Sequence, residues 1–209
     1  MKLEDLMNDF TPPKCQTENQ LAGKTNGRRS VKCFELSTKY LYRRAFSEVQ
    51  LLNSLKDMSG FQTGYSYHSI TAGDVDAMSY LRLVMLYSGK IKHLLISTWV
   101  MSEEDVRQFE EWLEAGRIEK ADFYVGEIFP GSYVVEYSHL KEFADKYGRI
   151  AVFRNHSKII AGEAENFYFV CEMSANINTN PRTEQGVITI DKGLYEFYKA
   201  YFDDISSFE

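Results

Sequence analysis

The sequence predicts an α/β sandwich in which helices flank one mixed β-sheet. Segments with helical periodicity alternate with strand-like segments as far as residue 148. Several strand-like segments then follow one another with short links, which favours antiparallel hairpins and therefore strands of both directions. The 209 residues, 44% of them hydrophobic and 26% charged, are enough for one domain with a full core.

Alternating polar and apolar residues, or short apolar runs, identify the predicted strands. They cover residues 65–71, 92–98, 121–126, 149–154, 156–162, 167–173 and 187–190. Gly60 and Gly64 break the chain before the first strand.

Apolar residues at helical spacing predict helices over residues 37–58, 77–88, 102–115, 139–147 and 191–205. Asp74 or Asp76 can cap the second helix, and Ser102 with Asp105 has the spacing of a capping box. Helix ends are expected at Gly89, Gly116 and Gly148. On the closing helix, the residues expected to pack inward are Leu194, Tyr198 and either Tyr201 or Phe202.

The first part of the chain differs from the rest in composition and charge. Residues 1–35 are predicted to form an N-terminal arm, and residues 36–209 a single domain. The first 50 residues carry a charge of +3, whereas the remainder carries −9. Arg28, Arg29 and Lys32 are therefore candidate contacts to a nucleic-acid backbone, although a solvated basic segment is the plainer interpretation.

Composition excludes several classes of protein. The net charge of −6 argues against a general nucleic-acid coat, and no apolar run is long enough to span a membrane. Three cysteines without metal-like spacing favour free thiols, and acidic residues near the N-terminus do not fit a signal peptide. We therefore expect a cytoplasmic protein, with Cys171 buried in the core.

Three ionisable residues at fixed spacing lie in the stretch "NHSKIIAGE", residues 155–163. His156 and Lys158 are two apart, so on a strand they share a face. Histidine can attack phosphorus or move protons near neutral pH, and lysine is a compact cation for a phosphate oxygen. Glu163 is five residues beyond Lys158, and Gly162 offers a place for the chain to turn toward it. This pattern alone is a weak signal, because strand histidines and lysines are commonly structural.

A second polar stretch, "EMSANINTNPRTEQ", follows the strand at residues 167–173. Ser174 and Asn176 alternate, and their hydroxyl and amide groups can donate hydrogen bonds to an anion. Glu184 is placed to accept the second ring N–H of His156, which would set its tautomer. Pro181 and Arg182 suggest a rigid turn that presents this carboxylate.

Together these residues resemble the phospholipase D superfamily motif, in which H-x-K and an acid precede a strand that ends in a serine and an asparagine. The family has aspartate where this chain has Glu163, and glycine where it has Met173. The resemblance covers residues 150–205, and the ending is similar to a branch found in bacteria, phage and mobile elements.

The resemblance implies a specific chemistry. One histidine attacks phosphorus to form a phosphohistidine, a second protonates the leaving oxygen, and water releases the product, without a metal or other cofactor. By this resemblance His156, Lys158, Asn176 and Glu184 are catalytic, and Lys158, Ser174 and Asn176 bind phosphate. Glu163 is the motif acid.

The superfamily site needs two motifs, and this chain has one. His139 and Lys141 form a second H-x-K, but they lie in a predicted helix, where residues two apart do not share a face. The resemblance therefore implies a homodimer, in which each chain supplies one histidine, one lysine and one asparagine.

Two classes of function stay open. The first is a dimeric, metal-independent nuclease that cuts DNA or RNA. The second is a catalytically degenerate relative that grips nucleic acid without turnover. A lipid substrate is a weaker third, because no strongly amphipathic surface helix is evident.

Overall fold

The computed structural model describes residues 50–54, 60–72, 75–178 and 182–207. The predicted N-terminal arm lies outside these ranges, as do Arg28, Arg29, Lys32 and most of the helix predicted over residues 37–58, although residues 50–54 are helical. Within the described ranges, no helix has the length and apolar character that crossing a membrane requires.

A seven-stranded mixed sheet forms the centre of the fold, in the order β1-β7-β6-β5-β2-β3-β4. The strands are β1 (Ser66–Thr71), β2 (Ile91–Thr98), β3 (Ala121–Gly126), β4 (Gly148–Phe153), β5 (Ile159–Ala164), β6 (Tyr168–Met173) and β7 (Glu184–Thr189). Strands β2, β3 and β4 are parallel, whereas β5, β6 and β7 pair antiparallel with their neighbours. The predicted α/β fold with a mixed sheet is confirmed.

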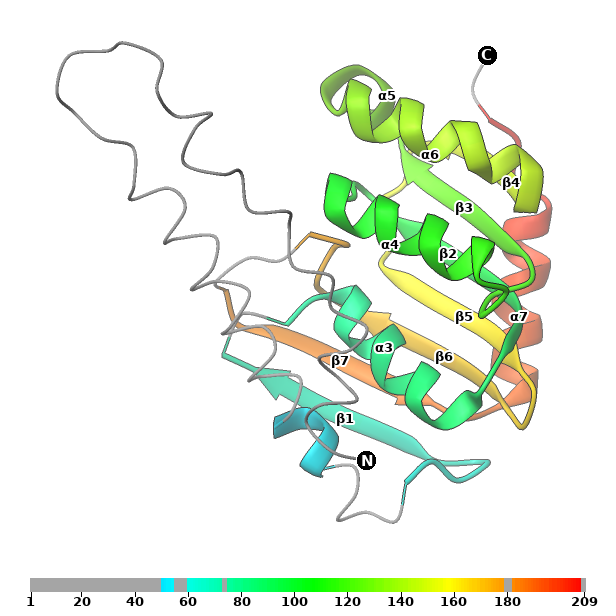
Figure 1. Cartoon of the computed structure of the whole chain (residues 1–209). Helices are drawn as coiled ribbons and strands as arrows, with labels where there is room; N and C mark the ends of the chain where they lie inside the picture. The colour runs from blue at the N-terminus through cyan, green and yellow to red at the C-terminus, as the bar shows by residue number, and fades with distance from the viewer. Residues whose placement is uncertain (1–49, 55–59, 73–74, 179–181, 208–209) are drawn as a thin grey trace, which may run out of the picture.

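Helices cover both faces of the sheet. They are α3 (Ala77–Ser88), α4 (Glu103–Glu114), α5 (Phe129–Ser132), α6 (Val134–Tyr147) and α7 (Lys192–Asp203). Figure 1 shows α3, α4 and α6 on one face of the sheet and α7 on the other. The short helix α5 was not predicted, and α6 begins five residues before the predicted start because of the turn at α5.

Local capping explains where the helices begin. Asp76, not Asp74, caps α3, and its side chain accepts a hydrogen bond from Ser79 N at 3.2 Å. Ser102 caps α4 by accepting from Asp105 N at 3.3 Å. Both caps satisfy backbone N–H groups that have no partner inside the helix.

Two apolar clusters lie on opposite faces of the sheet. The larger one packs α3, α4 and α6 onto it, and the smaller one packs α7. On α7 the fully buried residues are Tyr195 and Phe202, whereas Tyr201 is 58% exposed, so Phe202 is the correct one of the two predicted alternatives. Cys171 is buried in β6 as predicted, and burial raises the pKa of its thiol.

A hydrogen-bonded group under α7 joins three elements. His93 Nδ1 lies 2.7 Å from Tyr195 Oη, and His93 Nε2 lies 2.7 Å from Asp122 Oδ2. Burial disfavours the charged form of Asp122, but the hydrogen bonds and positive charges of His93 and Lys120 outweigh it and lower the pKa. The group therefore ties α7 to β2 and β3.

Asp122 should make stability depend on pH in the acid range. Its folded-state pKa lies below the ordinary value of 3.8, so the ionised carboxylate stabilises the fold above that value. This contribution is lost as the pH falls through the folded-state pKa. In urea denaturation between about pH 5 and pH 2, the wild type should lose more free energy of unfolding than Asp122→Asn. Asp145→Asn, at an exposed carboxylate of α6, is the matched control. Equal losses in the wild type and Asp122→Asn would contradict this expectation.

Candidate functional site

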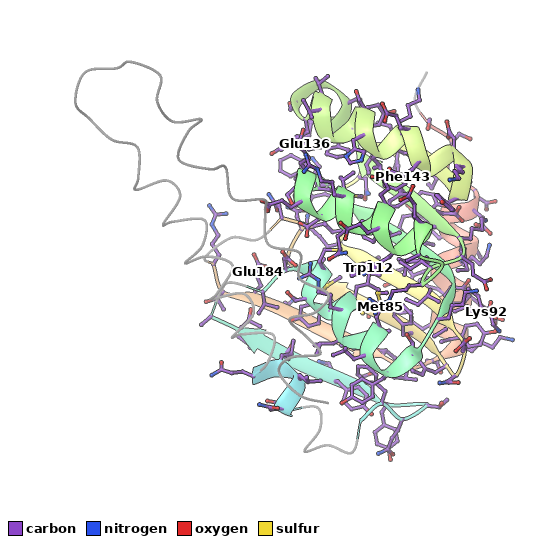
Figure 2. The ribbon with its side chains drawn as sticks, viewed as in Figure 1. Met85, Lys92, Trp112, Glu136, Phe143 and Glu184 are labelled. Carbon is purple, nitrogen blue, oxygen red and sulfur yellow. The ribbon has the colours of Figure 1, made fainter. Side chains whose placement is uncertain are left out.

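The candidate site lies at one end of the strands, on the side of the sheet where β1, β2, β3, β4 and β6 end and where β5 and β7 begin. This side is the carboxyl edge of the sheet, because the three parallel strands β2, β3 and β4 end there. Glu184, the first residue of β7, marks this edge in Figure 2, whereas Lys92 near the start of β2 marks the opposite edge. The carboxyl ends of strands are where ligands bind in open α/β sheets. The predicted residues at or beside this edge are His156, Lys158, Ser174, Asn176 and Glu184.

A tight turn built by Asn155 places His156. The strand predicted from residue 156 begins only at Ile159, because the Asn155 side chain stops it. Asn155 Oδ1 accepts hydrogen bonds from Ser157 N at 3.0 Å and Ser157 Oγ at 2.7 Å, which is an Asx turn. The prediction that His156 and Lys158 share the face of a strand is therefore wrong, and the turn brings them together instead.

The same amide anchors the turn to the sheet. Asn155 is buried, and its Nδ2 donates to Ser97 Oγ at 3.0 Å, Thr98 O at 3.2 Å and Tyr124 O at 2.8 Å. Ser97 Oγ also lies 2.6 Å from Ser157 Oγ. The loop that carries His156 is thus fastened to the ends of β2 and β3.

His156 and Lys158 are in direct contact. Lys158 Nζ lies 2.9 Å from His156 Nδ1 and donates to the His156 carbonyl oxygen at 2.6 Å. His156 is exposed, whereas Lys158 is only 9% exposed. Burial lowers the pKa of Lys158, and the charge of Glu184 partly opposes this. The lysine is therefore a largely buried cation beside an accessible imidazole.

This contact sets the tautomer of the resting imidazole. A lysine ammonium can only donate, so His156 Nδ1 accepts, and the proton of the neutral ring lies on Nε2. The Nε2–H group is then available to an approaching group, because His156 is exposed. The predicted hydrogen bond from His156 to Glu184 stays a prediction.

Ser174 and Glu184 are hydrogen-bonded to each other across the ends of β6 and β7. Ser174 Oγ donates to Glu184 Oε2, and Gln185 N donates to Ser174 Oγ at 3.0 Å. Glu184 is 9% exposed, whereas Ser174 is exposed. The negative charge of Glu184 acts to raise the pKa of Lys158, against the effect of burial.

The loop after β6 carries Asn176 to the amino end of α3. Asn176 O accepts from Ala77 N at 3.4 Å, Ile177 N donates to Thr98 Oγ1 at 3.4 Å, and Ser102 N donates to Ile177 O at 2.9 Å. Among the described residues, Asn176 Oδ1 is buried without a hydrogen-bond partner. The backbone of residues 176 and 177 is therefore held between the amino end of α3 and the end of β2.

The structure does not bring Glu163 to the site. Glu163 Oε1 pairs with Lys92 Nζ at 3.3 Å, and Figure 2 shows Lys92 at the edge opposite Glu184. The chain does not turn at Gly162, because β5 continues straight through it. A Cβ atom at Gly162 would lie 2.6 Å from the Phe169 ring, so the glycine permits close packing rather than a turn.

Met173 connects the two predicted motifs through its backbone. Met173 N donates to Lys158 O at 3.0 Å, which extends the pairing of β5 and β6 up to the site. Its side chain is half-buried against the larger apolar cluster. This pairing sets the backbone of Lys158 opposite Met173, the residue before Ser174.

Trp99 is a site neighbour that the sequence prediction missed. Its ring centroid lies 5.4 Å from that of His156, and it directly follows β2. The other missed residues are Asn155, Ser97 and Ser157. Asparagine two positions before serine is a recognisable Asx-turn signal, but nothing local to residues 97–99 indicates contact with residue 156, more than 50 positions later.

The remaining histidines lie elsewhere. His139 is in α6, with Nε2 2.9 Å from Glu110 Oε2, so its spacing to Lys141 does not form a second site. His68 is exposed on β1, and His93 is buried under α7. In the part of the chain that the structure describes, no group of three or more His, Cys, Asp or Glu residues could hold a metal ion.

The Asn155 amide should contribute strongly to stability. Asn155→Asp replaces its donor group with an oxygen that faces three acceptors, so we expect a loss of at least about 2 kcal/mol in the free energy of unfolding. Asn166→Asp, in the exposed link between β5 and β6, should change it by less than about 0.5 kcal/mol. Chemical denaturation measures both, and equal effects would show that the Asn155 hydrogen bonds contribute little.

Comparison with known proteins finds similarity to solved structures but not to sequence families. No protein-family model matches the chain, and no curated protein matches it. The solved structures include NucT from Helicobacter pylori, at 14% identity and a TM-score of 0.48 over 66% of this chain and 94% of that one. Polyphosphate kinase from Porphyromonas gingivalis has 10% identity and a TM-score of 0.49, over 66% of this chain and 25% of that one. Phosphatidylserine synthase from Haemophilus influenzae Rd KW20 has 14% identity and a TM-score of 0.46, over 65% of this chain and 37% of that one.

Proposed function

We propose that this protein is a phosphodiesterase of the phospholipase D type that cleaves nucleic acid through a phosphohistidine, without a metal. The observation that carries the proposal is the contact between exposed His156 and largely buried Lys158, whose Nδ1 and Nζ atoms lie 2.9 Å apart at the carboxyl edge of the sheet. A nucleophile and a cation for phosphate oxygens are thereby held together, with Ser174 and Glu184 on the adjoining strand ends.

Lys158 binds the phosphate. Its present acceptors are an imidazole nitrogen and a carbonyl oxygen, both uncharged, so a phosphate oxygen would be a stronger partner for the ammonium. Ser174 and Asn176 supply hydroxyl and amide donors from the loop after β6. Phosphate binding draws Lys158 away from His156 Nδ1 and frees that nitrogen.

The two ring nitrogens support two roles. Resting His156 carries its proton on Nε2, away from Lys158; the ring that protonates the leaving alcohol must also be protonated on Nδ1, so that it gives up its Nε2 proton and becomes neutral. The attacking ring needs the opposite tautomer, and Glu184 is the carboxylate that accepts its Nδ1–H once Lys158 has moved to the phosphate. Its Nε2 lone pair then forms the N–P bond while the P–O bond to the leaving alcohol breaks. Water next attacks phosphorus and gives a proton to the second ring, the N–P bond breaks, and both rings return to their starting protonation states.

The second histidine comes from a second copy of the chain. The described residues contain one such His–Lys pair at the sheet edge, and the mechanism uses two imidazoles. A two-fold axis that faces two His156 rings across one phosphate would supply both. The basic segment with Arg28, Arg29 and Lys32 remains a candidate contact to the nucleic-acid backbone.

A non-catalytic DNA-binding protein is the alternative. It is favoured by the position of Glu163, because the acid of the resembled motif lies at the opposite edge of the sheet and pairs with Lys92. Met173 also replaces a glycine beside the site. A binding protein would keep Lys158, Ser174 and Asn176 as a phosphate cradle without using His156 as a nucleophile.

Mutation of His156 separates the two functions. His156→Ala should reduce cleavage of single-stranded DNA by at least about 1,000-fold while leaving most DNA affinity, because Lys158 and Asn176 remain. Lys158→Ala should weaken both. His139→Ala and Lys141→Ala form the matched control, because they alter the same spacing in α6. Cleavage that persists in His156→Ala would exclude the phosphohistidine, and tight binding without wild-type cleavage would favour the alternative.

Excess EDTA should leave cleavage unchanged, because the proposed chemistry uses only side chains. The reaction would be followed near neutral pH with the same oligonucleotide, and His156→Ala would report any contaminating nuclease. Loss of activity on chelation, with recovery on adding Mg²⁺, would show that a metal performs the reaction.

Mixing wild-type and His156→Ala subunits tests the shared site. If each site needs both rings, only wild-type dimers cleave, so equal amounts after subunit exchange should give about a quarter of the wild-type activity. Independent sites would instead give about half. Sedimentation equilibrium should show a dimer at micromolar concentration, and a monomer that cleaves would rule out the shared site.

A further inference from the structure

We propose that Trp99 is a stacking surface for a nucleobase next to the attacked phosphate, and that the substrate is therefore single-stranded or unpaired nucleic acid. This inference rests on the proposed function and specifies its substrate class. It adds a residue that the H-x-K and Ser-x-Asn patterns do not include.

Trp99 stands directly beside the reacting group. The two ring centroids of Trp99 and His156 are 5.4 Å apart, with 58° between the planes. The indole is half-buried, with one side packed on the larger apolar cluster. Its remaining surface therefore lies beside the exposed imidazole, where the nucleotide that carries the attacked phosphate must also lie.

The backbone of Trp99 is fixed before any ligand binds. Gly126 N donates to Trp99 O at 3.1 Å, and Asn155 Nδ2 donates to the preceding Thr98 O at 3.2 Å. A Cβ atom at Gly126 would lie 2.3 Å from Trp99 Cδ1, so only glycine leaves room for the indole. A preformed aromatic surface loses little conformational freedom when a base stacks on it.

The chemistry of the surface favours a base over other phosphodiester groups. Every nucleobase has a flat π-face, and stacking on an exposed aromatic side chain adds affinity without requiring a particular sequence. Bases inside a duplex already stack on their neighbours and cannot reach such a ring without leaving the helix. A lipid headgroup has no aromatic ring, so its binding would not depend on an indole. Arg154, exposed in the same loop, adds a positive charge for the backbone.

The test compares substrates that differ only in the base. Binding is measured in His156→Ala, which prevents turnover, with a short single-stranded DNA and with the same chain made abasic at the central positions. The abasic chain should bind about 10-fold or more weakly. Trp99→Leu should remove this difference by weakening only the DNA with bases, whereas Trp99→Phe should keep most of it.

Fluorescence gives an independent reading. The chain has two tryptophans, and Trp112 is buried in α4, so stacking should quench mainly Trp99. Quenching by the base-bearing DNA should be absent with the abasic chain and in Trp99→Phe. Phe197→Leu, at an exposed aromatic residue of α7, is the control for loss of a surface ring and should change neither affinity nor quenching.

Several outcomes would overturn the inference. They are equal affinity for the two DNAs, an equal effect of Trp99→Leu on both, tighter binding of duplex than of single strands, or Trp99-dependent binding of phospholipid vesicles in preference to DNA. The comparison of the two DNAs needs no change at Trp99, so poor folding of Trp99→Leu would not hide the answer.

If His156→Ala abolishes cleavage but the base makes no difference, the proposed function stands and this inference fails. Base-dependent binding without wild-type cleavage would support the inference and remove the catalytic proposal.

Discussion

The hydrogen bonds of one buried amide hold the site together. Asn155 Oδ1 closes the turn that carries His156, and its Nδ2 binds oxygen atoms at the ends of β2 and β3. Each bond contributes about 0.5–1.5 kcal/mol, and leaving one of these buried groups unpaired costs about 1–3 kcal/mol. The turn therefore has one well-defined position, and so has the backbone that carries His156 and Lys158. The amide also donates to the carbonyl oxygen of Thr98, immediately before Trp99, so His156 and Trp99 are anchored by the same side chain.

The charges at the site leave it receptive to an anion. Lys158 is largely removed from water, and burial lowers its pKa, while the nearby carboxylate of Glu184 opposes that effect. The ammonium is hydrogen-bonded to the Nδ1 and carbonyl oxygen of His156, which are uncharged atoms, and Ser174 donates to Glu184. A cation held in this way gains by exchanging neutral acceptors for phosphate oxygens. In the proposed mechanism the exchange also releases the imidazole, so that phosphate binding and preparation of the proposed nucleophile are one event.

Comparison of two histidines in the same sheet shows what distinguishes a reactive site from a structural one. His93 is hydrogen-bonded to the carboxylate of Asp122 and the hydroxyl of Tyr195, and a histidine with such partners is also found in catalytic sites. It is only 8% exposed beneath α7, and both ring nitrogens are engaged by protein groups. His156 has a cation on one nitrogen and solvent around the ring. Access and a free nitrogen, rather than the number of polar neighbours, make His156 the candidate for chemistry.

The sequence alone predicted the α/β fold, most of the helices and strands and the mixed character of the sheet, because periodicity and capping depend on residues within a few positions of each other. It missed α5 and began the strand β5 three residues too early. It also supplied His156, Lys158, Ser174, Asn176 and Glu184 as candidate site residues, since short motifs preserve spacing. Tertiary structure decided what each of these residues touches. Strand order put β5 beside β2, which brought Trp99 to His156 and Asn155 to Ser97, pairs separated by more than 50 residues. The same strand, running straight through Gly162, carried Glu163 to the opposite edge, although only five positions separate it from Lys158. An extended chain advances about 3.3 Å per residue, so residues a few positions apart on one strand lie far apart in space. Contacts between residues on different strands depend instead on strand order and register.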